Sequence, residues 1–302
     1  MLLCSFLLQL GCPTYATNPQ GCQIRNYPRQ VITTFDYLVI MMPSSFQLDP
    51  TDQAFAVRDL SVLFGPKAAV DHLNLDVPHG SIFGLVGPNG AGKTTMISAA
   101  TGLLRPQSGS AWINGVNVWE EPVAAKAHFG LLIDGMPVFD RLTATEYLEF
   151  LGGLRSMAPD VVAQRSEELL RTLGLAEAKD KQIVDFSAGM TKKILLAGAL
   201  LHAPRVLILD EPLEAVDPAS GQLIQKILRN YARSGGTVLL SSHVMELVEG
   251  LCDHVAIINQ GTVIASGTVD EVRGTGTLVD KFVELVGSTQ LDDDSFGWLG
   301  GK

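Results

Sequence analysis

The sequence has no long apolar run, few cysteines and fewer basic than acidic side chains. No segment of its 302 residues approaches the roughly 18–20 uninterrupted apolar positions of a membrane helix, so we expect no integral membrane span. The 22 basic residues stand against 32 acidic ones, a formal net charge of −10, and this balance predicts no nucleic-acid partner. Of four cysteines, Cys4, Cys12 and Cys22 precede the body of the chain and Cys252 lies within it. This distribution excludes a disulfide framework and a zinc motif, and it predicts a reduced, cytosolic protein.

The two ends of the chain differ in composition from the rest. The N-terminal run MLLCSFLLQLGC is similar to the apolar core of a signal peptide, but no Lys or Arg precedes it. We favour an upstream start or a disordered extension, with the true start near Met41 or Met42, over a signal-like segment. Residues 1–50 are therefore predicted to be an N-terminal extension, residues 51–287 the folded domain and residues 288–302 an acidic tail.

From about Asp52 onward, short apolar runs alternate with longer helical patterns, which is typical of an α/β fold. The run from Ser81 to Gly87 predicts a strand, and the residues from Lys93 onward predict a helix. The loop between them has the spacing G-x-x-x-x-G-K-[ST], the Walker A phosphate loop, in the strand–loop–helix context that this motif requires. The candidate phosphate-binding residues are Gly87, Pro88, Asn89, Gly90, Ala91, Gly92, Lys93, Thr94 and Thr95.

The residue types of this loop suit a nucleoside triphosphate. Glycines allow consecutive backbone N–H groups to turn toward one anion, and the positive end of the helix dipole points to the same place. Lys93 is expected to contact the β and γ phosphates, and the hydroxyl of Thr94 can ligate Mg²⁺. The alternative, a glycine-rich turn with a solvated lysine, does not account for the flanking strand and helix.

A second apolar run ends in two adjacent carboxylates. The residues from Val206 to Leu209 are all apolar, as in a strand buried on both faces, and Asp210 and Glu211 follow at its carboxyl end, where open α/β sheets bind ligands. Two buried acids without partners would be costly, so a cation or a proton donor is expected beside them. We assign Asp210 to Mg²⁺ and Glu211 to the attacking water, as orienting group or general base. A pair of exposed turn acids is the alternative.

A third strand, predicted over Val238 to Leu240, leads to Ser241, Ser242 and His243. A histidine at a strand end is by itself more often a capping or packing residue. Because two other strand ends already point to a nucleotide, we interpret His243 as a candidate sensor of the γ-phosphate.

Together with the segment between them, these three strand ends resemble the ATP-binding subunit of an ABC transporter. The resemblance covers nearly the whole body of the chain and depends most on the pentapeptide FSAGM at 186–190, which is similar to the family's LSGGQ signature motif. Ser187 is a suitable N-cap for the helix that follows, although a capped helix alone would be an ordinary structural feature. Ala188 departs from the fuller consensus, which has glycine there. The resemblance assigns Ser187 and Gly189 to the ATP of an opposite subunit.

Three further site residues are implied by the resemblance. Phe64 falls where the family stacks an aromatic ring on adenine, although it could equally be a core residue of a strand. Asp217 ends a segment, EAVD, that is similar to the D-loop and would lie at a dimer interface, while by itself the segment is a turn before Pro218. Asp134 takes the position of the Q-loop glutamine, which links the ATP site to the membrane partner. Whether Asp134 has a catalytic and metal-binding role or is a turn acid before Gly135 stays open.

The resemblance also implies the fold and the partners. It predicts a P-loop NTPase (RecA-like) core, a small antiparallel β subdomain and an inserted α-helical subdomain at about residues 121–190, with Thr143 or Thr145 and Asp160 as helix start signals. The implied function is ATP hydrolysis, with Mg²⁺, that powers an export-type transporter at the cytoplasmic face of the cell membrane. A separate transmembrane permease and a second ATP-binding subunit, identical or not, are the expected partners. The alternative is a soluble ABC-type ATPase with an assembly, ribosome-associated or repair role, which the single phosphate loop and the lack of a heptad run disfavour.

Overall fold

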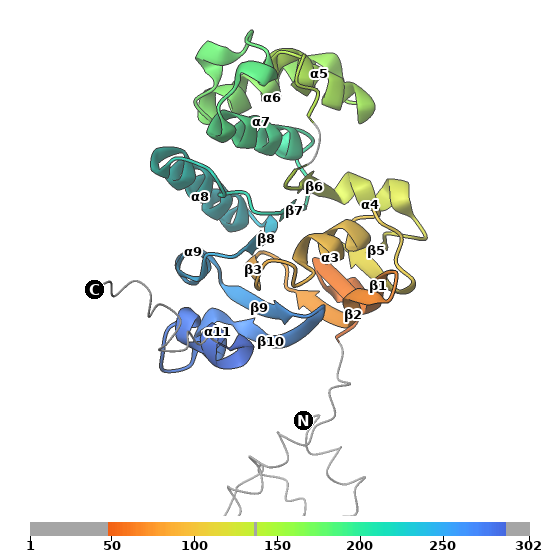
Figure 1. Ribbon diagram of the computed structural model, residues 1–302. Helices are drawn as coiled ribbons and strands as arrows, with labels where there is room; N and C mark the ends of the chain where they lie inside the picture. Colours follow the sequence, from red (N-terminus) through yellow and green to blue (C-terminus); the bar gives the residue numbers. More distant parts are fainter. Residues whose placement is uncertain (1–47, 136–137, 288–302) are drawn as a thin grey trace, which may run out of the picture. The chain divides into compact units, whose positions relative to one another are not determined.

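The computed structural model describes residues 48–135 and 138–287. The predicted N-terminal extension, except for its last three residues, and the predicted acidic tail lie outside the described residues. In the described part, two β-sheets and the helices around them form the body of the chain (Figure 1).

The smaller sheet is antiparallel throughout. Its strands are β1 (Phe55–Phe64), β2 (Lys67–Val77), β4 (Ser108–Ile113) and β5 (Val116–Asn117). They are ordered β2-β1-β4-β5, and β1 and β2 form a long hairpin that turns between Phe64 and Lys67. This sheet agrees with the expected antiparallel β subdomain.

The larger sheet carries the strand ends that the motifs follow. Its strands are β3 (Ile82–Val86), β6 (Phe129–Leu132), β7 (Val206–Leu209), β8 (Thr237–Ser242), β9 (His254–Asn259) and β10 (Thr262–Thr268). In the order β10-β9-β3-β8-β7-β6, the five strands from β9 to β6 run parallel, and β10 lies antiparallel at one edge. β8 is longer than predicted, because Ser241 and Ser242 still pair with β3. The carboxyl ends of β3, β6, β7 and β8 therefore meet at one edge of the sheet.

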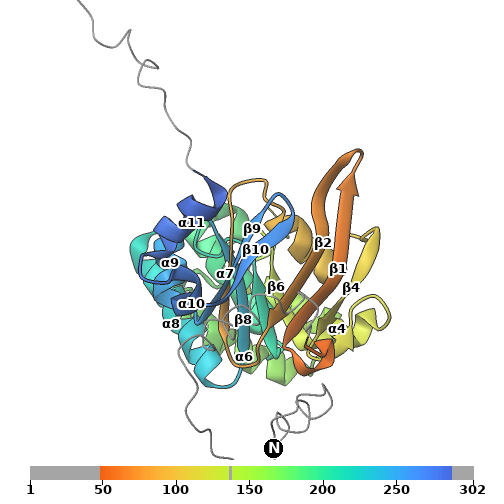
Figure 2. The same cartoon turned by 90° about the horizontal axis from the view of Figure 1, so that it is seen from below.

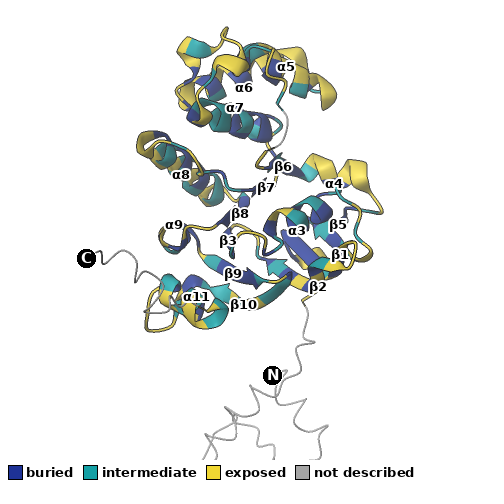
Figure 3. Ribbon diagram, viewed as in Figure 1, coloured by how far each residue is buried: buried dark blue, intermediate teal, exposed yellow. Residues whose placement is uncertain are grey.

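Alternate side chains of the larger sheet enter two hydrophobic clusters. In β3, Phe83 and Leu85 belong to the cluster shared with the smaller sheet and with α3 (Lys93–Ala100), and Ile82 and Val86 belong to the other. The second cluster includes side chains of α7 (Ala188–Leu200), α8 (Pro218–Arg233) and α9 (Met245–Leu251). Figure 2 shows α8 and α9 on the side of the core strands away from the smaller sheet. The core strands are buried on both faces (Figure 3), which explains their continuous apolar runs.

The helical insertion contains α5 (Ala144–Leu154) and α6 (Pro159–Thr172), which pack against α7. Thr143 caps α5 in a capping box with Glu146, so this start signal is confirmed. The hydroxyl of Thr145 instead donates to the carbonyl of Lys179. The start signal at Asp160 lies in the first turn of α6, one residue after its beginning.

The interval predicted for the helical subdomain, about residues 121–190, begins with elements of the core. α4 (Pro122–His128) leads into β6, which is an edge strand of the larger sheet, so the helical part starts after β6. The remaining helices of the described part are α10 (Val269–Arg273), α11 (Leu278–Val286) and short 3₁₀-helices at Pro50–Asp52, Ala176–Ala178 and Ile183–Asp185. Within residues 48–135 and 138–287, no helix has the length and hydropathy required to cross a membrane.

Candidate active site

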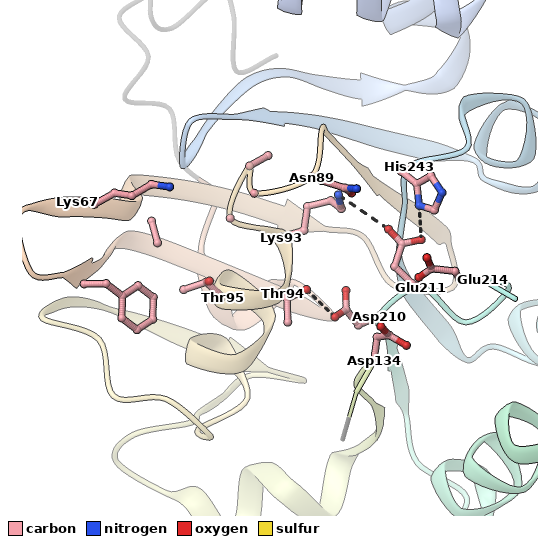
Figure 4. A pocket seen from close by; sticks show the side chains of 15 residues that line it. Lys67, Asn89, Lys93, Thr94, Thr95, Asp134, Asp210, Glu211, Glu214 and His243 are labelled. Carbon is pink, nitrogen blue, oxygen red and sulfur yellow. Dashed lines mark hydrogen bonds and ion pairs between the residues drawn. The ribbon is translucent and has the colours of Figure 1, made fainter. Parts of the chain in front are cut away.

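A pocket of about 400 Å³ lies at the carboxyl ends of the parallel strands. The loops after β3, β6, β7 and β8 line it, together with the hairpin of β1 and β2 (Figure 4). Of the predicted site residues, the pocket brings together Phe64, Asn89, Gly90, Ala91, Gly92, Lys93, Thr94, Thr95, Asp134, Asp210, Glu211 and His243. Pro88 lines an adjoining pocket along the same loop.

The phosphate loop depends on two glycines that have no room for a side chain. A Cβ at Gly87 would overlap the carbonyl oxygen of Ile258 in β9, and a Cβ at Gly92 would overlap that of Ala69 in β2. Gly92 also has a φ of 106°, in the left-handed region. Gly92 is the N-cap residue of α3 and provides no side-chain cap, so the N–H groups of the first turn remain available to an anion.

Lys93 lies folded over the phosphate loop. Its ammonium donates to the carbonyl oxygens of Gly87 (2.8 Å) and Pro88 (3.4 Å), and it lies 3.9 Å from Glu211 Oε1. The side chain is 7% exposed, and this burial lowers its pKa, although the nearby Glu211 and Asp210 oppose the shift. A bound phosphate would give this buried ammonium a strong, charge-assisted partner.

Asp210 is fully buried and accepts hydrogen bonds from two hydroxyls. Thr94 donates to its Oδ2 at 2.7 Å and Ser241 to its Oδ1 at 2.5 Å. Adjacent hydroxyl and carboxylate oxygens at the phosphate loop are the hard ligands that Mg²⁺ prefers, so the residues present fit that ion. Among the described residues there is no group of three or more His, Cys, Asp or Glu able to hold a metal. An ion at Thr94 and Asp210 would therefore take further oxygens from a bound triphosphate or water.

Glu211 has a constrained backbone and a carboxylate at the pocket wall. Its φ of 46° lies in the left-handed region, which is uncommon for a residue other than glycine. Its N–H donates to Ser241 Oγ at 3.0 Å, and its Oε2 lies 3.1 Å from Nδ1 of His243. The carboxylate side chain is 13% exposed. A carboxylate in this position can accept a proton from a water in front of the phosphate loop.

Phe64 and Asp134 line the pocket from different elements. Phe64 ends β1, pairs with Lys67 across the hairpin and is 55% exposed, so it is not a core residue and its ring face is available for stacking. Asp134 follows β6 and precedes Gly135 in a turn, and its Oδ1 accepts a hydrogen bond from Lys192 at 2.7 Å. The side chain of Asp134 thus has a specific partner in addition to its place in a turn.

Besides Gly87 and Pro88 of the phosphate loop, three predicted residues do not line this pocket, namely Ser187, Gly189 and Asp217. Ser187 is exposed and caps α7 by accepting the N–H of Met190 at 3.3 Å, as predicted. Asp217 caps α8 and accepts the N–H of Ser220, which holds its pKa below the usual range. A Cβ at Gly189 would lie 3.2 Å from Asp217 Oδ2, so the signature segment and the D-loop touch within one chain. Ser187, Gly189 and Asp217 therefore lie outside the lining of the nucleotide pocket, although Glu214, at the start of the D-loop segment, lines it.

Four polar residues of the site were not singled out by the motifs, namely Lys67, Lys192, Glu214 and Ser241. Ser241 bonds to both Asp210 and Glu211, and the sequence indicates it only through its place at the end of an apolar run. Glu214 is indicated only as the first residue of the segment EAVD. Lys192 reaches the site from the interior of α7, which no local pattern indicates.

The phosphate loop follows β3, and the two acids end β7, a parallel strand that lies two places from β3 in the sheet. This arrangement defines a P-loop NTPase. The family described as "ABC transporter" matches residues 70–214. "Linearmycin resistance ATP-binding protein LnrL" of Bacillus subtilis (strain 168) is 38% identical over 211 residues, covering 70% of this chain and 68% of that protein. "Daunorubicin resistance ATP-binding protein DrrA3" of Streptomyces coeruleorubidus is 35% identical over 222 residues, covering 74% and 70%. A solved structure described as "Structure of ATP binding subunit of ABC transporter" is 28% identical with a TM-score of 0.72, covering 77% and 99%.

The chain belongs to the family of ABC transporter ATP-binding proteins. It is an ATP-binding subunit and an ATPase. The predicted fold, a P-loop NTPase core with a small antiparallel β subdomain and an inserted α-helical subdomain, is confirmed. Subunits of this family dimerise and work with membrane permeases. The alternative of an ATPase outside transport is not favoured, because the matching family is described as "ABC transporter" and a further relative, 34% identical, is named "ABC transporter ATP-binding protein NatA".

Proposed function

We propose that this chain powers the export of drug-like compounds through a separate membrane-spanning permease, from the cytoplasmic face of the membrane. The names of its relatives, which include resistance to linearmycin and to daunorubicin, support export of drug-like small molecules.

The positions of the side chains in the pocket support a separate role for each of them in ATP hydrolysis. Lys93 binds the β and γ phosphates, and Thr94 and Asp210 would hold Mg²⁺, which supplies charge neutralisation when bound. Glu211 accepts the proton of the attacking water, and His243, hydrogen-bonded to it, senses the γ-phosphate. Phe64 stacks on the base, and Asp134 is a candidate for contact with the metal or its waters.

The observation that carries the two-subunit mechanism is the separation of Ser187 and Gly189 from the pocket of their own chain. An exposed, capped helix N-terminus of this kind can bind an anion, and the partner's γ-phosphate is the anion that a head-to-tail dimer would bring. Asp217, in contact with Gly189, would lie at the same interface.

Two substitutions separate ATP binding from hydrolysis. Glu211→Gln keeps the shape of the side chain but removes the proton acceptor, so we expect normal ATP affinity and a loss of turnover of about 100-fold or more. Lys93→Ala removes a charged phosphate contact of the loop, so we expect affinity itself to fall. Nucleotide titration and steady-state hydrolysis distinguish these outcomes, with the exposed Glu149→Gln and Lys181→Ala as controls. Wild-type turnover in Glu211→Gln would remove this residue from the base role.

The transport part of the proposal has its own test. Purification of the Glu211→Gln protein from detergent-solubilised membranes of its native host should recover a membrane-spanning protein as the main partner. Recovery of ribosomal or other non-membrane complexes in its place would contradict export and favour the alternative ATPase class.

A further inference from the structure

One largely buried lysine on the signature helix reaches the loops after β6 and β7. Lys192 lies in the second turn of α7, the helix that Ser187 caps, and its side chain is 12% exposed. Its ammonium donates to Asp134 Oδ1 at 2.7 Å and to the main-chain carbonyl oxygen of Glu211 at 3.0 Å. This single side chain therefore connects α7 with the loop after β6 and the loop after β7.

Lys192 and Asp134, the two members of this ion pair, differ in their access to water. The side chain of Asp134 is 49% exposed, so water can solvate its carboxylate without help from Lys192. The ammonium is the less exposed member of the pair, and a charge with little access to water requires partners within hydrogen-bonding distance. Asp134 therefore neutralises and orients Lys192, and the ion pair mainly compensates the poorly solvated charge of the lysine.

The carbonyl group that Lys192 contacts belongs to a residue in an unfavourable backbone conformation. Glu211 has a φ of 46°, which a residue with a Cβ adopts only when its surroundings enforce it. Ser241 accepts its N–H, and its carbonyl oxygen accepts from Lys192 at 3.0 Å and from the N–H of Glu214 at 3.3 Å, so both main-chain groups of Glu211 are held. Holding both groups fixes the direction of the Cα–Cβ bond, and with it the position of the carboxylate near Lys93 and His243.

Lys192 does not itself line the nucleotide pocket, whereas Glu211 and Asp134 do. It has no place from which to act on a phosphate or on the attacking water directly. Any effect of Lys192 on hydrolysis must therefore pass through the residues that it holds.

We propose that Lys192 is a positioning residue for ATP hydrolysis: it holds the main chain of Glu211 in its left-handed conformation, and Asp134 keeps the ammonium in place. This rests on the proposed role of Glu211 as the group that accepts the water's proton. Because Lys192 and Ser187 belong to the same helix, the arrangement also ties the position of the catalytic carboxylate to the helix that meets the partner's nucleotide.

The test measures kcat, ATP affinity and melting temperature in the full chain for a set of variants. Lys192→Met keeps the apolar stem and removes the donor, and we expect kcat to fall at least tenfold with ATP affinity within about twofold of wild type. Lys192→Arg keeps a charged donor and should recover a large part of kcat. Asp134→Ala, at an exposed side chain that does not threaten folding, should lower kcat less than Lys192→Met. Lys181→Met is the matched control at an exposed lysine and should leave all three quantities unchanged.

Two double variants separate positioning from the ion pair alone. Lys192→Met should cause no further loss of kcat when it is added to Glu211→Gln, because the group that it positions has already lost its function. In the exchange Asp134→Lys with Lys192→Asp, the ion pair can form again, but Asp at 192 cannot donate to the carbonyl of Glu211. We therefore expect this exchange not to restore kcat.

The outcomes distinguish this inference from the function on which it depends. Wild-type kcat in Lys192→Met, or recovery of kcat in the exchanged pair, would overturn the positioning role even when Glu211→Gln is inactive. A further large loss on adding Lys192→Met to Glu211→Gln would also overturn it, because the lysine would then act by another route. Full turnover in Glu211→Gln itself would refute the proposed role of Glu211, and the inference with it.

Discussion

At the scale of single residues, one half-buried histidine outside the motifs, His202, is expected to make the stability of the fold depend on pH. His202 follows α7, and its Nε2 lies 3.0 Å from the carbonyl oxygen of Phe129, while its Nδ1 is buried with no hydrogen-bond partner among the described residues. Burial, together with the positive charges of Arg155 and Arg165, lowers the pKa of His202 to about 4. The folded protein therefore keeps this ring neutral at a pH where the unfolded chain protonates it.

This shift predicts a loss of stability in mild acid. Above the unfolded pKa of about 6.5 the ring is neutral in both states and has no effect, whereas between about 6.5 and 4 only the unfolded chain binds the proton. The free energy of unfolding should therefore fall as pH decreases through this window, by up to about 3 kcal/mol from this group. His202→Gln should show a flatter dependence in urea unfolding at about pH 7 and about pH 5, and the exposed His79→Gln should behave as wild type. Identical pH slopes for His202→Gln and wild type would contradict this assignment.

The residues that the sequence could predict are those whose role follows from local spacing. Lys93, Thr94, Asp210 and Glu211 fall where a strand–loop–helix unit and a strand end must place them, and the structure brings them to one pocket. Lys192 and Ser241 could not be assigned in the same way, because each acts through a contact with a loop distant in sequence. The spacing of motif residues predicts which residues form a loop. It does not predict which position of a distant helix, such as Lys192 in α7, will face that loop.

At the scale of secondary structure elements, the signature helix α7 packs directly on the edge strand β6 at a glycine. A Cβ at Gly130 in β6 would overlap the carbonyl oxygen of Ala199 near the end of α7. Because the obstacle is backbone, a flexible side chain cannot move aside to make room. The glycine is therefore a requirement of this helix–strand contact.

Gly130→Ala should separate α7 from β6 and destabilise the protein. Overpacking of this kind costs about 1–3 kcal/mol or more, so we expect a clear decrease in the midpoint of urea unfolding. Gly153→Ala is the matched control, since a Cβ there meets open space within α5 and should stabilise the helix by about 0.5–1 kcal/mol. Equal midpoints for the two variants would show that the strand and helix can shift apart without cost.

The elements that the sequence predicts well are those with strong end signals. The caps at Thr143 and Ser187 and the strand Val206–Leu209 agree with the structure. The interval around residues 121–190 was harder, because β6 has four residues and becomes part of the core sheet only by pairing with β7, more than seventy positions later. Strand pairing between residues so far apart in the chain produces no local sequence pattern by which it could be predicted.

At the scale of the whole molecule, the proposed head-to-tail dimer predicts complementation between two inactive variants. Lys93→Ala disables the pocket of its own chain, and Ser187→Arg should fill the γ-phosphate site that its chain offers to the partner. In a mixed dimer one site contains both changes, and the other pairs an intact pocket with an intact signature surface. ATPase activity should therefore reappear on mixing, provided that one working site suffices.

The control for this experiment is each variant mixed with itself, together with a measurement that mixed dimers form. Recovery of activity would be difficult to explain with a site built within one chain. Mixtures that stay inactive although mixed dimers are present would mean that both sites must work together or that the sites are not shared.

The two hydrophobic clusters on opposite faces of the larger sheet have a consequence for cooperativity. Neighbouring residues of one strand, such as Leu85 and Val86, belong to different clusters, so neither cluster keeps its packing surface when the strand is lost. The helices of the insertion belong to the same arrangement, since Leu148 of α5 packs in the cluster of Val86. Heat should therefore melt the smaller sheet and the helical insertion in a single transition, without a partly folded species in which one has melted and the other persists.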